Sequence, residues 1–355
     1  MINSIERKAL VMDNVLKEDL QYIADYNLPY KKLKGTTVLV TGATGLIGTS
    51  LVRALLAIGD IKVIAFVRNE EKAKKIYKDF SESSLFFHVA DIVGRIEIDE
   101  PIDYIFHCAS VTTSKIMIEK PVETLLISVE GTKNILELAR KQKCKSVVYI
   151  SSMEVYGAFE ESEEVTEKDL GYIDNLKIRS NYPESKRLCE NMCVAYNAEY
   201  NVPIKIARLA QTFGAGILPG ENRVFAQFAR SAIKGEDIIL HTKGLSEGNY
   251  CYTRDCVTGL LTILLKGENA EAYNVSNPET HITIAEMAKM VCEEFTEGKN
   301  KVIFDIPEEN SFGYAADTKM KLSSEKLQTL GWKPEIGLKE AYRRLILSME
   351  TVYND

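Results

Sequence analysis

From residue 36 to about residue 213, short apolar runs alternate with longer segments in which apolar positions recur at helical spacing. The apolar runs include TTVLVTG, KVIAFV, DYIFHCAS and SVVYISS. Runs that are mostly apolar are typical of parallel strands buried on both faces, with helices forming the connections between them. The pattern therefore predicts an α/β fold with a doubly wound parallel sheet, a Rossmann domain, over residues 35–213.

Two further regions flank this part of the chain. Residues 1–34 place apolar positions such as Ile5, Leu10 and Leu20 among many charges, which predicts an N-terminal helical extension. After residue 214 the alternation gives way to loops and shorter elements, although ITIAEMAKMVCEEF and EAYRRLILSMETVY predict helices. We expect residues 214–355 to form mainly a smaller substrate-binding region, with some segments returning to the Rossmann domain.

The composition restricts the ligands and the compartment. The 355 residues carry 44 Lys and Arg against 51 Asp and Glu, a formal charge of −7, so no overall positive field favours nucleic acid or an anionic membrane. Seven cysteines without a CxxC motif, and only four histidines, predict reduced thiols in the cytoplasm and no metal site. The sequence shows neither a signal peptide nor the ~18 apolar residues that a membrane span requires.

The segment VLVTGATGLIG, residues 38–48, carries the clearest chemical signal. It leads from an apolar strand through Gly42, Gly45 and Gly48 into a helix, with the spacing GxxGxxG. Glycines at such a turn let the backbone approach a pyrophosphate closely, and the helix N-terminus attracts the negative charge. The segment predicts a dinucleotide cofactor, NAD or NADP.

The ends of the next two strands bear on the choice of cofactor. An acidic residue that would bind the ribose hydroxyls is missing after the second strand, where Arg68 stands instead. Arg68 could bind a ribose 2′-phosphate or stack on adenine, which slightly favours NADP, or it could be a solvated charge. Asp91 after the third strand could accept a hydrogen bond from the adenine amine, or simply cap the strand end.

A second signal combines Tyr182 and Lys186 in NYPESK with a serine, Ser152, at the end of the strand VVYISS. The tyrosine and the lysine are one helical turn apart. A free phenol titrates near ~10, so a nearby ammonium would be needed to lower the pKa of Tyr182 and make it a base at neutral pH. Ser152 could share a proton with Tyr182 and a substrate hydroxyl, or cap the strand end.

Four motifs in this order, TGATGLIG, HCAS, SSMEVYG and YPESK, resemble the extended short-chain dehydrogenases/reductases, and among them the NAD(P)-dependent nucleotide-sugar epimerase/dehydratase family. The resemblance covers about residues 36–345. It implies a tightly bound NAD or NADP on the glycine loop, with Tyr182 as base, Lys186 as its partner and Ser152 as proton-sharing hydroxyl. Further expected cofactor contacts are Thr44, Leu46, Ile47, Ile92 and Ala109.

The resemblance also implies a reaction in which a sugar hydroxyl, usually at C4, is oxidised to a transient ketone before epimerisation, dehydration or decarboxylation. Glu154 resembles the glutamate of the 4,6-dehydratases and UDP-glucuronate decarboxylases, or it is a salt-bridged glutamate at a strand end. Met153 stands where hexose dehydratases carry an aspartic acid, and a thioether cannot protonate a leaving hydroxyl. We therefore expect decarboxylase-like or dehydratase-like chemistry, with a 4-epimerase or a net NADPH-dependent ketoreductase as alternatives.

The expected substrate is a sugar linked to a nucleoside diphosphate. The arginine that usually precedes the FxYVxD segment of this family is missing, since Gly248 and Asn249 stand near its place. The cations that could bind the diphosphate instead, each with a structural salt bridge as the alternative, are Arg208, Arg223 and Arg254. The expected substrate site also includes Thr112, Met153 and Gln211.

Two predicted helices, ETLLISVEGTKNILELARK and PESKRLCENMCVAYNAEY, resemble the pair that forms a four-helix dimer interface in this family. We expect a homodimer, although both helices could merely cover the sheet.

Overall fold

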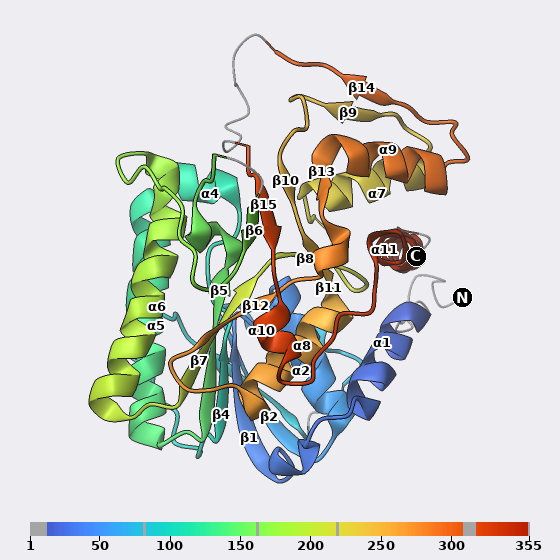
Figure 1. Ribbon diagram of the computed structural model, residues 1–355. Coiled ribbons are helices and arrows are strands. Elements are labelled where there is room, and N and C mark those ends of the chain that lie inside the picture. Colours follow the sequence, from blue (N-terminus) through green and yellow to red (C-terminus); the bar gives the residue numbers. More distant parts are fainter. Residues whose placement is uncertain (1–12, 81–82, 161–162, 218–219, 308–316, 354–355) are drawn as a thin grey trace, which may run out of the picture.

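The computed structural model describes residues 13–80, 83–160, 163–217, 220–307 and 317–353. Within these ranges the central sheet has seven strands in the order β12-β7-β5-β4-β1-β2-β3, and all adjacent strands are parallel. The predicted doubly wound parallel sheet is confirmed (Figure 1). The strands are β1 (Thr36–Thr41), β2 (Ile61–Val67), β3 (Leu85–Val89), β4 (Tyr104–His107), β5 (Ser146–Ser152), β7 (Ile204–Leu209) and β12 (Ala272–Val275).

Helices cover both faces of the sheet, and the side chains of β1 show why. Val38 and Val40 belong to the apolar core on one face, whereas Leu39 between them belongs to the core on the other. Successive side chains of a strand point to opposite faces, so a strand covered on both sides is apolar throughout. The helices of the first face include α1 (Asn14–Asp25), α2 (Leu46–Ile58) and α8 (Thr253–Lys266), and those of the second are α5 (Pro121–Gln142) and α6 (Asn181–Tyr200).

A third apolar core lies beyond the carboxyl edge of the sheet. It contains Phe225, Met287 and Tyr342, which come from α7 (Val224–Lys234), α9 (Ile284–Phe295) and α11 (Leu338–Tyr353). Short strand pairs lie in and around this part, with β9 and β14 at its far end from the sheet, whereas α8 and β12 return to the sheet layer itself (Figure 1). The pairs are β8 (Gln211–Phe213) with β11 (Tyr250–Tyr252), β9 (Ile238–Leu240) with β14 (Val302–Phe304), β10 (Glu247–Gly248) with β13 (Ile282–Thr283), and β6 (Glu163–Val165) with β15 (Met320–Leu322).

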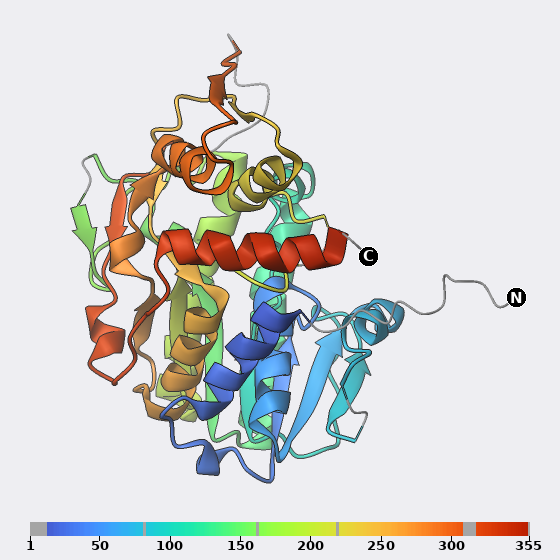
Figure 2. The same ribbon diagram turned by 90° about the vertical axis from the view of Figure 1, so that its right-hand side faces the viewer.

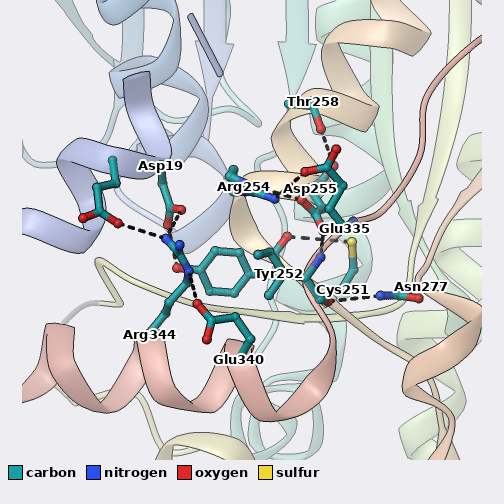
Figure 3. A network of polar contacts seen from close by, with 12 residues as sticks. Asp19, Cys251, Tyr252, Arg254, Asp255, Thr258, Asn277, Glu335, Glu340 and Arg344 are labelled. Atoms are coloured by element: carbon teal, nitrogen blue, oxygen red, sulfur yellow. Dashed lines mark hydrogen bonds and ion pairs between the residues drawn. The ribbon is translucent and has the colours of Figure 1, made fainter. Parts of the chain in front are cut away.

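Helix α1 connects this third core with the core on the first face of the sheet. It packs against α2, α8 and α11, and Figure 2 shows it beside α2 below the long α11. Its Asp19 is 3% exposed and accepts hydrogen bonds from the Tyr252 hydroxyl at 2.5 Å and from Arg344 Nη1 at 3.0 Å (Figure 3). Burial raises the pKa of Asp19 to about 6. Residues 1–12 of the predicted extension lie outside the described residues.

The other α-helices of the described ranges are short, namely α3 (Glu70–Ile76), α4 (Ser114–Glu119) and α10 (Glu325–Gln328). In the part of the chain that the structure describes, no helix has the length and apolar character needed to cross a membrane. All seven cysteines are free thiols.

Candidate active site

The glycine turn after β1 has the close packing that a phosphate loop requires. Gly42 has a φ of +62°, and a Cβ on it would lie 2.8 Å from the backbone nitrogen of Ala109. A Cβ on Gly48 would collide with the carbonyl of Gly42. Neither position therefore accepts a side chain without a backbone shift. The packing also brings the predicted contact Ala109, just after β4, against the glycine turn.

The start of α2 is suited to bind a pyrophosphate. Gly45 is the N-cap residue, and no side chain caps the helix there. The N–H groups of Leu46 and Ile47 in the first turn are thus free for an anionic ligand, and the helix dipole favours negative charge at this end. These features of the chain fit a dinucleotide, whose nicotinamide accepts and returns a hydride when it is bound.

The remaining predicted cofactor residues lie near the carboxyl ends of neighbouring strands. Arg68 follows β2 and is exposed, and Asp91 is exposed two residues after β3, with a carboxylate oxygen accepting from the Val93 amide at 3.2 Å. Ile92 is buried, and Thr44 is half-buried in the glycine turn. Strands β1, β2 and β3 are adjacent in the sheet, so these residues are arranged along one edge of it. Their contacts with a cofactor remain predictions.

The structure brings Ser152, Tyr182 and Lys186 together. Tyr182 and Lys186 lie on the first turns of α6, and the Lys186 Nζ is 5.7 Å from the centre of the Tyr182 ring. The same Nζ donates to the carbonyl of Ile150 on β5 at 2.7 Å. Ser152 ends β5, and its hydroxyl accepts from the Glu154 amide at 3.2 Å and hydrogen-bonds with Tyr182. A proton can therefore pass between Ser152, Tyr182 and a ligand hydroxyl.

Burial dominates the titration of this group. It raises the pKa of Tyr182 well above its ordinary value, the Glu154 carboxylate raises it further, and Ser152, Arg179 and Arg223 lower it. Burial also lowers the pKa of Lys186 to about 8. The expected lowering of the Tyr182 pKa by an ammonium is therefore outweighed in this structure, because desolvation penalises the charged forms of both groups.

An arginine that the sequence analysis missed accompanies Glu154. The Nη2 of Arg179 donates to Glu154 Oε1 at 3.0 Å and lies 2.9 Å from Oε2. Its Cζ is 5.8 Å from the centre of the Tyr182 ring. Glu154 is thus ion-paired, as one of the two alternatives predicted, yet it also lies close enough to Tyr182 to act on the titration of the phenol.

Met153 and Gly248 occupy adjoining positions beside Glu154. Met153 is 6% exposed, and a Cβ on Gly248 would lie 3.6 Å from its methyl carbon. The thioether therefore approaches the backbone of Gly248, near the position where the sequence resemblance implies an arginine. The neighbouring Asn249 is buried and bonded to protein at both ends of its amide, since it donates to the Asn277 carbonyl and accepts from the Leu322 amide. Asn249 is thus engaged in the protein interior.

Two of the three arginines expected on the diphosphate are engaged elsewhere. Arg208 is 8% exposed, and its Nε and Nη2 bind the Glu190 carboxylate while Nη1 donates to Tyr156 and to the Glu167 carbonyl. Its donors are used inside the protein, and the expected substrate contact of Arg208 remains a prediction. Glu190 also accepts from Ser151 on β5, so the pair joins α6 to two strands of the sheet.

Arg254 is the second of these arginines, and its substrate contact also remains a prediction. Its guanidinium lies 3.7 Å from the centre of the Tyr22 ring on α1 and pairs with Asp255 and Glu335, each at 3.2 Å (Figure 3). The side chain is 8% exposed. Arg254 joins the N-terminal helix to α8, because the Tyr22 ring of α1 lies over its guanidinium while two carboxylates pair with its charge.

The other expected substrate residues lie at more open positions. Arg223 pairs with Glu221 through Nε at 3.0 Å and Nη2 at 2.7 Å, yet it is close enough to lower the pKa of Tyr182. Gln211 is exposed at the start of β8, and Thr112 is exposed in the segment between β4 and α4. Their contacts with a substrate remain predictions.

Two residues that the sequence analysis passed over had detectable signals. Arg179 is three residues before Tyr182, so a cation lies next to the proposed base in the sequence itself. Glu190 follows Lys186 by four residues on the same helix, which places it one turn further along the same face. Neither residue type is specific without its tertiary partner.

A glycine turn that fits a dinucleotide and a buried tyrosine next to a serine lie at the same edge of the sheet, an arrangement that suits the reversible oxidation of a hydroxyl group. That combination defines a nicotinamide-dependent enzyme of the short-chain dehydrogenase/reductase type. Residues 38–276 match the model of the NAD dependent epimerase/dehydratase family. The chain belongs to this family, and of the two cofactors that the sequence left open, the family uses NAD.

Relatives with known activities agree with this assignment. UDP-glucuronic acid decarboxylase 2 of Arabidopsis thaliana is 29% identical over 310 residues, 87% of this chain and 67% of the relative. UDP-glucuronic acid decarboxylase 1 of Danio rerio is 28% identical over 315 residues, 87% of this chain and 71% of the relative. The UDP-glucose 4-epimerase structure from Thermotoga maritima superposes with a TM-score of 0.77 at 22% identity, covering 90% of this chain and all of that one. The last comparison supports the fold.

Proposed function

We propose that the protein is an NAD-dependent decarboxylase of UDP-glucuronate. The observation that carries the proposal is the placement of Glu154 beside Tyr182 while Met153, which cannot donate a proton, occupies the position where hexose dehydratases have an acid. Loss of carbon dioxide needs no acid for a leaving hydroxyl. The similarity to the two decarboxylases supports the same choice.

The residues of the site take the following roles in this proposal. Tyr182 removes the proton of the C4 hydroxyl, with Ser152 hydrogen-bonded to both oxygens. Loss of the C4 hydrogen as a hydride, which bound NAD would accept, leaves a ketone at C4. This ketone then accepts the electron pair of the bond between C5 and the carboxylate carbon, and carbon dioxide leaves. The resulting enolate takes a proton at C5, and we assign this proton transfer to Glu154. Return of the hydride to C4 and of the proton from Tyr182 to O4 completes a UDP-pentose.

The test is an incubation of the purified protein with NAD and UDP-glucuronate labelled with carbon-13 at C6. We expect labelled carbon dioxide and a UDP-pentose, detected by mass spectrometry. Formation of UDP-galacturonate with the label retained would establish a 4-epimerase instead. A stoichiometric loss of NADPH would establish a ketoreductase, and turnover of dTDP-glucose or UDP-glucose to a 4-keto-6-deoxy sugar would establish a dehydratase.

We further propose that α5 and α6 form the interface of a homodimer. The two helices pack against each other and carry exposed apolar side chains. Leu126 on α5 is 43% exposed and Leu188 on α6 is 50% exposed, which is unfavourable for a surface left in water. Light scattering should give twice the chain mass for the wild type, and Leu188→Glu should give the chain mass alone. A wild type of one chain mass at micromolar concentration would contradict the proposal.

The compartment is proposed on the state of the thiols. All seven cysteines are free, and six of them are buried. Since a protein of an oxidising compartment usually pairs its cysteines, we propose a cytoplasmic protein.

A further inference from the structure

Arg179 has more hydrogen-bond donors than the protein uses. It belongs to a short 3-10 helix, Ile178–Ser180, directly before α6, and its side chain is 23% exposed. Only its Nη2 contacts Glu154, and among contacts between described residues neither Nε nor Nη1 has an acceptor. A guanidinium has five N–H groups in one plane, so one edge of it remains free to bind a planar anion.

The free edge of Arg179 lies next to the reacting position. Its Cζ is 5.8 Å from the centre of the Tyr182 ring, and its charge lowers the pKa of the Tyr182 hydroxyl. In a sugar acid the C4 hydroxyl and the carboxylate are attached to neighbouring ring carbons. A sugar whose O4 contacts Tyr182 therefore brings its carboxylate close to the same group of charges.

The other cations near Tyr182 are less able to bind that carboxylate. Lys186 is 3% exposed and donates to the Ile150 carbonyl. Arg223 is engaged with Glu221 through both Nε and Nη2. Because the Glu154 carboxylate is in the site, a second carboxylate would be repelled unless a cation accompanied it. Arg179, by contrast, is 23% exposed, and among the described residues both its Nε and its Nη1 lack an acceptor.

We propose that Arg179 is the specificity-determining residue that binds the carboxylate of the sugar acid through its free edge while Nη2 stays on Glu154. The inference rests on the proposed function, since it assigns a residue to the group that the decarboxylation removes. One guanidinium then joins two carboxylates, that of the enzyme and that of the substrate. A neutral sugar in the same site gains nothing from the free edge, so Arg179 discriminates between UDP-glucuronate and UDP-glucose.

The test measures binding to the NAD-loaded protein by titration calorimetry, in the Tyr182→Phe background so that the ligands are not consumed. We expect Arg179→Gln to weaken UDP-glucuronate binding by on the order of tenfold to a hundredfold, as for a lost charge-assisted pair. Its affinity for UDP-glucose and for UDP should stay within about twofold. Arg179→Lys, which keeps the charge without the fork, should fall between wild type and Arg179→Gln.

Two matched variants separate a local effect from a general one. Lys177→Gln removes an exposed cation two residues away that pairs with Asp174, and it should leave all three affinities unchanged. Arg223→Gln tests the expected diphosphate contact, and it should weaken all three ligands alike. Unfolding curves of Arg179→Gln and Arg179→Lys check that both variants fold.

The outcomes distinguish this inference from the proposed function. If the parent protein binds UDP-glucuronate no better than UDP-glucose, the proposed function fails. If the parent discriminates and Arg179→Gln discriminates equally well, the function stands and the inference is overturned. A uniform loss of all three affinities in both Arg179 variants would also overturn the inference, because it would make Arg179 a purely structural partner of Glu154.

Discussion

Two ion-paired regions of the molecule use arginine in opposite ways. At the N-terminal helix, Arg344 contacts the carboxylates of Glu18, Asp19 and Glu340, and its side chain is 15% exposed (Figure 3). At the end of β5, Arg179 contacts one carboxylate, keeps free donors and is 23% exposed. Among the described residues, the first arginine pairs with three carboxylates and the second with one.

The difference shows what decides the role of a partly buried cation. A guanidinium that pairs with several carboxylates holds elements of the fold together, because its removal leaves those carboxylates without a partner in the interior. A guanidinium that pairs with one carboxylate beside a reactive hydroxyl has donors left for a ligand. Arg208 is bonded through all three of its guanidinium nitrogens, and Arg254 pairs with two carboxylates, although their sequence positions near the family motifs suggested substrate contacts.

The largest effect on activity should come from the region at the end of β5, where Tyr182 lies beside Arg179. Tyr182→Phe removes the proton-transferring hydroxyl and should lower kcat by roughly 10²–10⁴-fold. NAD affinity and the midpoint of thermal unfolding should change little, since the ring remains. Carbon dioxide release, cofactor titration and thermal unfolding measure the three quantities. Tyr172→Phe, at a side chain that is 72% exposed, is the control, and a Tyr182→Phe variant as active as this control would contradict the assignment.

Glu154→Gln should have the next largest effect. The variant keeps the shape of the side chain but loses the charge that pairs with Arg179, so the steps after oxidation should slow by about 10²-fold. Reduced cofactor or a 4-keto sugar should accumulate, which absorbance and mass spectrometry can follow. Glu184→Gln removes another carboxylate of moderate exposure, one on α6 that pairs with Arg187, and should behave as wild type. Equal rates for the two variants would make Glu154 structural.

Arg254→Met tests the group of ion pairs around the N-terminal helix α1. The change leaves Asp255, which is 2% exposed, without its ion pair, although the amides of Glu335 and Ile336 still donate to it at 2.8 Å. We expect the free energy of unfolding to fall by about 2–3 kcal/mol, less than for a carboxylate that loses every partner. The KM for the nucleotide sugar should not change. A raised KM with unchanged stability would restore the substrate contact expected from the sequence.

A smaller effect should appear in the pH dependence of stability. Burial raises the pKa of Asp19 from 3.8 to about 6 in the folded state, so the folded protein binds this proton more tightly than the unfolded chain does. Asp19 should therefore lower the free energy of unfolding progressively as the pH rises from about 4 to about 6. Urea unfolding of wild type and Asp19→Asn across this range should show the decline in the wild type alone. Parallel curves would show that another group titrates.

The sequence was most informative where its signal is local. The strand preceding Gly42, the glycine spacing and the helix that follows are contiguous, and the structure shows the strand, the tight glycine turn and the helix as predicted. The alternation of apolar runs and helices predicted the parallel sheet for the same reason, since each strand and helix carries its own pattern. The turn between Tyr182 and Lys186 is likewise a property of one helix.

The sequence was least informative about the arginines. How many carboxylates pair with a guanidinium depends on residues elsewhere in the chain. Arg254 pairs with Glu335, and Arg208 pairs with Glu190. No periodicity encodes such pairs. The same limit hid Arg179, whose partner Glu154 is 25 residues away and is brought to it by β5 and the start of α6.

The sequence by itself thus determined the class of fold, the cofactor loop and the tyrosine, lysine and serine of the site, because short-range geometry and side-chain chemistry suffice for them. The tertiary structure alone decided which charges remain open to a ligand. It also decided that burial would govern the pKa values of Tyr182 and Lys186. Both depend on how much water and how many partners the packed chain leaves around each group.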